Sequence, residues 1–221
     1  QARLKDPNAQ MDPSVIRNIT HYLSAPEWDP IIGKIKNTKL MDPTSPVQVM
    51  FVPSYLNGVD GIFDKDYYEL LCGMDVTVFP SYYEPWGYTP LESVAFSVPT
   101  ITTSLAGFGL WVAEHCKEHK GVEVIDRNDA NDSEVVTEIA SSIEKFCNMS
   151  AKEYASYQES ALKTSEIALW ENLYAYYAHA YDVALARMTE RSSGFKYEGG
   201  GDQNEQINFC LLYTSDAADE L

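Results

Sequence analysis

Two glutamates, Glu84 and Glu92, stand eight residues apart across a stretch that is rich in Gly, Pro and aromatic residues. The apolar run before this stretch, residues 76–79, predicts a buried strand, and the residues after it predict the start of a helix. Backbone amides at a helix N-terminus that follows a strand bind anions. A nucleotide sugar carries a diphosphate between two groups with hydroxyls, so it suits an anion site flanked by two carboxylates.

The residues between the two glutamates have both a functional and a structural explanation. Gly87 lets a phosphate approach the backbone closely, and the amides near Gly87, Tyr88 and Thr89 lie where the helix dipole favours an anion. A plain turn accounts for the same residues. Thr89 to Glu92 also fits a capping box, with Thr89 as N-cap and Glu92 bonding back to the backbone. On spacing alone, capping is the better explanation for Glu92.

Glu84 differs from Glu92, because no cap or ion-pair partner for it is visible nearby in the sequence. A carboxylate among Tyr82, Tyr83, Pro85 and Trp86 favours a functional role. A buried tyrosine hydroxyl that donates to Glu84 is the structural alternative.

Short apolar runs alternate with helical patterns along the chain. The patterns predict helices over residues 10–24, 65–74, 90–96, 133–147, 151–167 and 171–189, strands over 47–53, 76–79, 100–103 and 122–125, and a Gly-rich loop over 106–109. This alternation predicts an α/β fold with a Rossmann-like parallel sheet and helices on both faces. Ligands of such sheets bind beyond the carboxyl ends of the strands, where Glu84 is expected.

Composition excludes several classes of protein. The 221 residues include 33 acidic and 16 basic ones, for a net charge of −17, which disfavours a nucleic-acid partner. The longest apolar runs break after about eight residues, whereas a membrane span needs about 20. The four cysteines have no metal-ligand spacing, so we expect reduced thiols, no metal and a cytoplasmic protein.

Four segments are expected. Residues 1–45 are interpreted as a helical or linker remnant of an upstream half, because the chain begins with Gln1 rather than Met. Residues 46–150 are expected to form the nucleotide-sugar-binding domain, and 151–191 to form C-terminal helices. Residues 192–221 are expected to be a disordered Gly-rich linker and a tail that resembles translated sequencing-adapter read-through.

The order of residues around the two glutamates resembles a known family. The twelve residues from Phe79 to Pro90, followed by Glu92, by Pro99 to Thr103 and by Gly107-Phe108-Gly109, resemble glycogen synthases of the animal and fungal type in a bacterial-looking variant. The resemblance covers residues 47–188. It implies the C-terminal, nucleotide-binding half of a two-domain GT-B glycosyltransferase.

The resemblance implies roles for single residues. Glu84 would be the catalytic glutamate that holds hydroxyls of the donor glucose, and Glu92 would bind the ribose. Trp86, Gly87, Tyr88 and Thr89 would shape the pocket for the diphosphate and the sugar. Tyr67 would stack on uracil, with Tyr55 on the other side of the base. Without the resemblance, Tyr67 is better explained as a core or surface aromatic of a helix.

The reaction implied is transfer of glucose from UDP-glucose to the non-reducing end of an α-1,4-glucan, with retention at the anomeric carbon and without a cofactor. The family's phosphate-binding Arg/Lys pair would lie before Gln1, so the chain alone is expected to be inactive. Another GT-B enzyme and a nucleotide-binding module without catalysis remain alternatives. The choice between UDP and ADP and a homo-oligomer of the intact protein stay open.

Overall fold

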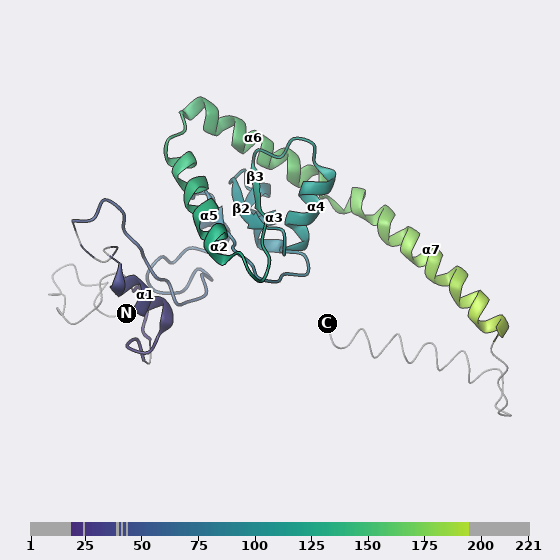
Figure 1. Cartoon of the computed structure of the whole chain (residues 1–221), viewed down its shortest axis with the longest axis horizontal. Coiled ribbons are helices and arrows are strands. Elements are labelled where there is room, and N and C mark those ends of the chain that lie inside the picture. The colour runs from purple at the N-terminus through teal and green to yellow at the C-terminus, as the bar shows by residue number, and fades with distance from the viewer. Residues whose placement is uncertain (1–18, 24, 39, 41, 43, 195–221) are drawn as a thin grey trace. The chain divides into compact units, whose positions relative to one another are not determined.

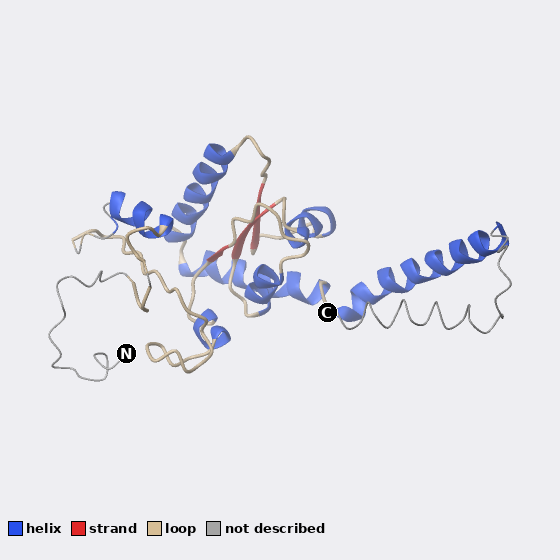
Figure 2. Cartoon of the chain, turned by 90° about the horizontal axis from the view of Figure 1, so that it is seen from below, coloured by secondary structure: helices blue, strands red, loops and turns tan. Residues whose placement is uncertain are grey.

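The computed structural model describes residues 19–23, 25–38, 40, 42 and 44–194 (Figure 1). The chain divides into two compact units, residues 1–167 and 168–221. The first unit contains a parallel sheet of strands β1 (Thr77–Val78), β2 (Thr100–Thr103) and β3 (Val122–Ile125), in the order β1-β2-β3. The strands lie side by side in Figure 2. The predicted strands 100–103 and 122–125 are confirmed, and the predicted strand 76–79 is shorter by one residue at each end.

Helices cover both faces of this sheet. Helix α3 (Tyr88–Ala95) connects β1 to β2, α4 (Gly107–His115) connects β2 to β3, and α5 (Asp132–Cys147) and α6 (Ala151–Ile167) follow β3. One core cluster joins α3, α4 and α6 to β3 through Val94, Phe108, Val112, Cys116, Val122 and Ala161. A second cluster joins α5 to the sheet through Ile101, Ile125 and Val135. The predicted Rossmann-like α/β class is confirmed.

Buried hydroxyl groups tie α3 to the sheet. The Thr77 side chain lies 2.6 Å from the Ser93 hydroxyl and donates to the Thr100 hydroxyl at 2.9 Å. Ser93 in turn donates to the carbonyl of Val98 at 3.0 Å. Because buried polar groups are costly unless they are hydrogen-bonded, this network holds α3 against β1 and β2 in one arrangement.

The apolar pattern of residues 133–147 predicts a buried helix face of Val136, Ile139, Ile143 and Phe146, and the structure of α5 bears out only part of it. Ile139 and Phe146 pack against the core as predicted, but Val136 is 67% exposed and Ile143 is 39% exposed. Val135 and Ser142 take the buried positions instead. The residues that face the core therefore follow the spacing of four, three and four from Val135. A serine on that face hid the pattern from a search for apolar residues alone.

Two predictions near the N-terminal side need correction. Most of the predicted helix 10–24 lies outside the described residues, and residues 19–23 are not helical. Helix α1 (Pro30–Asn37) begins instead after Asp29, whose carboxylate accepts from two backbone amides. The predicted strand 47–53 is wrong, because Phe51 forms only an isolated bridge with Ile19.

Helix α2 (Tyr67–Leu71) is shorter than the predicted 65–74. Asp66 and Glu69 form a capping box at its start, and Gly73 follows its end. The second unit contains α7 (Trp170–Gly194), which includes the predicted helix 171–189. The predicted linker and tail lie outside the described residues from 195 onward.

Candidate functional site

The segment after β1, which we call loop 79–87, is hydrogen-bonded to β2 and to the residues that follow β2 at the carboxyl edge of the sheet. The amide of Phe79 donates to the carbonyl of Ile101 at 2.8 Å, and the Thr103 hydroxyl donates to the carbonyl of Ser81 at 2.8 Å. The amide of Glu84 donates to the carbonyl of Leu105 at 3.2 Å. The backbone of Glu84 is therefore fixed, while the residue as a whole is exposed to solvent.

Helix α3 begins without a side-chain cap. Its N-cap is Gly87, with φ 100° and ψ 76°, and no side chain accepts from its first amides. The predicted capping box from Thr89 to Glu92 is therefore wrong. The left-handed turn at Gly87 starts the helix at Tyr88, so Thr89 lies inside the first turn rather than before it. Within the described residues, the amides of Tyr88 and Thr89 have no acceptor, and both residues are exposed.

Helix α4 begins differently, because loop 79–87 supplies its acceptors. The amide of Gly107 donates to the carbonyl of Glu84 at 3.0 Å, and that of Phe108 donates to the carbonyl of Trp86 at 2.6 Å. The predicted Gly-rich loop 106–109 is in fact this helix start. The Trp86 ring lies 5.9 Å from the rings of both Phe108 and Trp111, so it packs onto the core.

Glu92 lies in a cluster of aromatic residues. The Tyr68 hydroxyl donates to Glu92 Oε1 at 2.9 Å, and the Tyr68 ring stacks on Phe96 at 5.2 Å. Tyr67 meets Tyr68 edge-on at 5.4 Å. Burial raises the pKa of Tyr67, and the negative charge of Glu92 raises it further. The structure thus brings Tyr67 and Glu92 together, whereas sequence reasoning missed Tyr68, the neighbour that bonds to Glu92.

Tyr55 is 92% exposed. An isolated bridge between Asn57 and Asp66 places its segment beside the start of α2, which carries Tyr67. The rings of Tyr55 and Tyr67 form no aromatic pair in the described part of the chain, so the structure brings their segments together but not their side chains.

Sequence reasoning also missed Arg127, which lies two residues beyond β3 at the same edge. Its guanidinium donates to the carbonyl of Pro80 at 3.0 Å and to Asp132 Oδ1 at 2.7 Å, and its central carbon lies 3.4 Å from the centre of the Tyr82 ring. Arg127 is 6% exposed. A basic residue directly after a predicted strand of a parallel sheet was the signal that could have found it.

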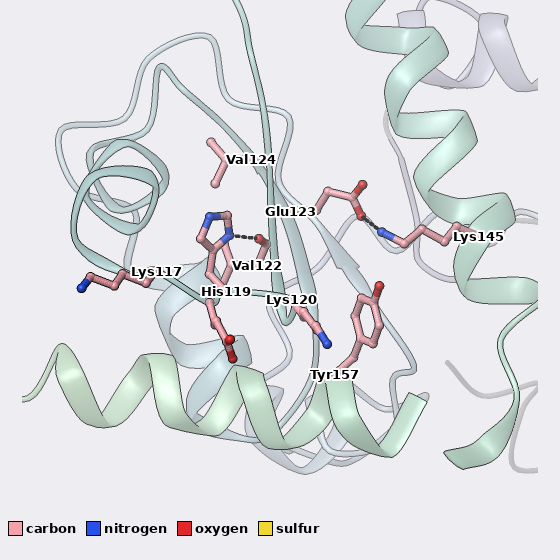
Figure 3. A pocket seen from close by; sticks show the side chains of 9 residues that line it. Lys117, His119, Lys120, Val122, Glu123, Val124, Lys145 and Tyr157 are labelled. Carbon is pink, nitrogen blue, oxygen red and sulfur yellow. Dashed lines mark hydrogen bonds and ion pairs between the residues drawn. The ribbon is translucent and has the colours of Figure 1, made fainter. Parts of the chain in front are cut away.

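A cavity of about 460 Å³ lies elsewhere, between residues 117–120, β3 and α6. Figure 3 shows that Lys145 directs its ammonium group to Glu123, at 3.3 Å, and that Lys117 points away from the cavity. The Lys145 ammonium also lies 5.3 Å from the centre of the Tyr157 ring. None of the predicted site residues lines this cavity.

Among the described residues no group of three or more His, Cys, Asp or Glu side chains is placed to hold a metal ion. No helix in the described part is long and apolar enough to cross a membrane. Cys72, Cys116 and Cys147 are free thiols, and burial raises the pKa of Cys116.

Comparison with known proteins identifies the family. The family model described as glycogen synthase matches residues 7–209. The chain belongs to the glycogen synthase family. This match contains loop 79–87, the starts of α3 and α4, and every predicted site residue from Tyr55 to Glu92.

Three curated members of the glycogen synthase family illustrate the likeness. The chain is 36% identical over 163 residues to glycogen [starch] synthase of Caenorhabditis elegans, covering 72% of this chain and 24% of the relative. It is 32% identical over 190 residues to isoform 1 of Saccharomyces cerevisiae, covering 83% and 26%. It is 32% identical over 171 residues to the human liver protein, covering 76% and 24%. The chain thus spans about a quarter of the length of these relatives.

Proposed function

We propose that this chain supplies the donor-binding edge of a glycosyltransferase, which transfers glucose from UDP-glucose to the non-reducing end of an α-1,4-glucan with retention. Membership of the glycogen synthase family supports the reaction class. The observation that carries the proposal is the open N-terminus of α3 between Glu84 and Glu92. Unfilled helix amides and the helix dipole together favour a bound diphosphate.

The sugar end of the donor is assigned to Glu84. A Cβ on Gly87 would lie 3.4 Å from Glu84 Cγ, so Gly87 lies next to the Glu84 side chain and adds no side chain of its own there. A diphosphate on the amides of Tyr88 and Thr89 then places the attached glucose toward Glu84. Negative charge develops on the diphosphate as the glycosidic bond breaks, and donors already in place stabilise that charge without reorganisation.

The nucleoside end is assigned to Glu92 and the aromatic residues around it. Tyr68 holds Glu92 Oε1, and Oε2 has no hydrogen-bond donor among the residues that the structure describes. The vicinal ribose hydroxyls are suitable donors for this second oxygen. Tyr67 and Tyr55 stack on the base in this proposal, and no cofactor is required.

Calorimetric titration with UDP, UDP-glucose and ADP tests the proposal. We expect UDP to bind saturably, and Glu92→Ala to weaken UDP binding about tenfold, or about 1.4 kcal/mol. Because Glu92 does not cap α3, the free energy of unfolding should change by less than about 0.5 kcal/mol. Glu138→Ala, at an exposed position in the middle of α5, is the control and should change neither quantity.

Two results would count against the proposal. Absence of saturable binding by UDP and UDP-glucose would remove the donor site. Equal binding by Glu92→Ala and the unchanged chain would remove Glu92 from it. Transfer of glucose is to be assayed in a protein that combines this chain with the remaining three quarters of a relative's length, where Glu84→Gln should abolish it.

A further inference from the structure

We propose that Arg127 is a positioning residue for Glu84: it holds loop 79–87 so that the Glu84 carboxylate meets the donor sugar. The inference rests on the proposed function, because it concerns the sugar end of the same site. It assigns a role in donor recognition to a buried cation that does not itself line the open start of α3.

Arg127, which follows β3, joins loop 79–87 to the start of α5. One guanidinium nitrogen donates to the carbonyl of Pro80 in loop 79–87, and another donates to Asp132, the first residue of α5. The face of the guanidinium lies under the Tyr82 ring, and the Tyr82 hydroxyl donates to both carboxylate oxygens of Asp132 at 3.1 Å. Arg127, Tyr82 and Asp132 therefore form a closed set of contacts, which we call the Arg127 triad.

The Arg127 backbone is fixed as well. Its amide donates to the Ser104 hydroxyl at 2.9 Å, and Ser104 in turn donates to Asp126 at 3.1 Å. Ser104 directly follows β2. The Arg127 backbone is thus held at the ends of β2 and β3. The contacts of its guanidinium therefore fix loop 79–87 relative to the sheet.

Glu84 is held from both sides. The Arg127 triad fixes Pro80 and Tyr82, four and two residues before Glu84. The start of α4 fixes Glu84 itself, through the carbonyl of Leu105 and the amide of Gly107. The α4 contacts set where the Glu84 backbone lies, while the triad sets the direction from which the chain reaches it. The first turn of α3 lies beyond Gly87, and the guanidinium hydrogen bonds of Arg127 in the described residues go to Pro80 and Asp132 rather than to that turn.

The chemistry of the contacts requires an arginine. A planar guanidinium donates in two directions and stacks on an aromatic ring at the same time, which a lysine ammonium cannot do. Its burial is costly, and Arg127 Nε is buried without a hydrogen-bond partner in the part of the chain that the structure describes. A residue kept at such a cost for stability alone would be replaceable by an apolar one. The geometry instead points to positioning.

A second cation–aromatic cluster, formed by α5, α6 and β3, provides a matched control for the Arg127 triad. Lys145, Tyr157 and Glu123 also combine a cation, an aromatic ring and a carboxylate, but they line the cavity of Figure 3. The side chain of Lys145 is 45% exposed, whereas that of Arg127 is 5% exposed. Lys145 contacts no residue of loop 79–87 in the described structure. Lys145→Met therefore removes a cation–aromatic contact without touching the site.

The first arm of the test uses the free chain. Hydrogen exchange of the Ser81 and Glu84 amides is measured for the unchanged chain, Arg127→Met, Arg127→Lys and Lys145→Met. We expect Arg127→Met to speed exchange at both amides by about tenfold and Arg127→Lys by less, with the amides of β2 unchanged. Unchanged exchange at Ser81 and Glu84 in Arg127→Met would overturn the proposal. If Arg127→Met does not fold, Arg127→Lys and Tyr82→Leu are compared in the same way.

The second arm measures UDP-glucose and UDP affinity in a double-mutant cycle with Glu84→Gln. We expect Arg127→Met and Glu84→Gln each to weaken UDP-glucose binding about fivefold, and the double variant to lose no more than either one. UDP binding should stay within about twofold throughout. Additive losses, or an equal loss for UDP, would overturn the proposal. Failure of the unchanged chain to bind either ligand would instead refute the proposed function, and the exchange arm would still decide the role of Arg127.

Discussion

Helices α3 and α4 begin at the same edge of the sheet, and both lack a side-chain cap. They differ in whether the protein supplies hydrogen-bond acceptors for their first amides. Those of α4 are bonded to the carbonyls of Glu84 and Trp86. Those of α3, at Tyr88 and Thr89, meet no acceptor among the described residues. Every helix start must find acceptors outside the helix. The difference therefore supports α3, rather than α4, as the proposed anion site.

Loop 79–87, which precedes α3, is hydrogen-bonded both to the end of β2 and to the start of α4. Loop 79–87 caps α4 with its own carbonyls and then turns at Gly87 into α3. The same backbone thus closes one helix start and leaves the other open. A site built in this way keeps its amides in place before the ligand arrives, which lowers the cost of binding.

The largest loss of stability is expected when the hydrogen bonds between loop 79–87 and the start of α4 are disturbed. In Gly107→Ala, the new Cβ would overlap the carbonyl oxygen of Pro85 and crowd the Trp86 backbone. We expect a loss of about 3 kcal/mol of unfolding free energy, from overpacking and from weakened bonds to Glu84 and Trp86. Urea denaturation measures it.

Gly33→Ala is the control for that experiment, because a Cβ on Gly33 meets no atom within 4 Å and lies in helix α1. It should stabilise the chain by about 0.5–1 kcal/mol. If Gly107→Ala were as stable as the unchanged chain, the close contact between loop 79–87 and α4 would be refuted.

A smaller loss of stability is expected when the backbone at Gly87, before the start of α3, is strained. Gly87 has a φ of 100°, where a residue with a Cβ is disfavoured, and its Cβ would lie 3.2 Å from Pro90 Cγ. We expect Gly87→Ala to cost about 2 kcal/mol of stability and to weaken UDP binding about tenfold. Denaturation and calorimetry provide the two readings.

Gly121→Ala separates general strain from site damage, because a Cβ on Gly121 would overlap the backbone of Ala161 in α6, away from loop 79–87 and α2. It should lose stability and keep its UDP affinity. Equal losses of affinity in the two variants would show that strain alone, rather than the shape of the α3 start, governs binding.

The smallest effect concerns the nucleoside end at alkaline pH. The hydrogen bond and the charge of Glu92 raise the pKa of Tyr68. A pKa raised by folding stabilises the protein below the unfolded pKa, which is about 10 for tyrosine, and that contribution is lost as pH rises through the folded pKa. The difference in melting temperature between the unchanged chain and Tyr68→Phe should therefore be constant below about pH 10 and shrink above it. In a protein that carries Glu92→Gln, adding Tyr68→Phe should no longer give this pH-dependent difference in melting temperature. If the pH-dependent difference persists there, the assignment to Glu92 is contradicted.

Much of the sheet could be predicted from the sequence. Strands β2 and β3 are short segments of mostly β-branched residues, which favour strands. The predicted strand 47–53 has a more apolar pattern, but it pairs only at Phe51. An apolar run becomes a strand only where a neighbouring backbone is available, which the run itself does not reveal.

The site was harder to predict than the sheet. The spacing of Glu84 and Glu92 around a helix start was visible, but the Thr89–Glu92 capping box was a misleading match. A left-handed Gly87 moves the start of the helix two residues toward the N-terminus. Arg127 follows the loop motif by some forty residues, and only the fold returns it to Pro80. Contacts between separate strand ends depend on the fold, so local spacing could not reveal them.

Amide chemical shifts during a UDP titration test the central claim most directly, because each helix start reports separately. The account predicts that the amides of Tyr88 and Thr89 shift most and saturate together, while those of Gly107 and Phe108 shift little. Saturable shifts at the start of α4 with none at the start of α3, or no saturable shift at either, would contradict it.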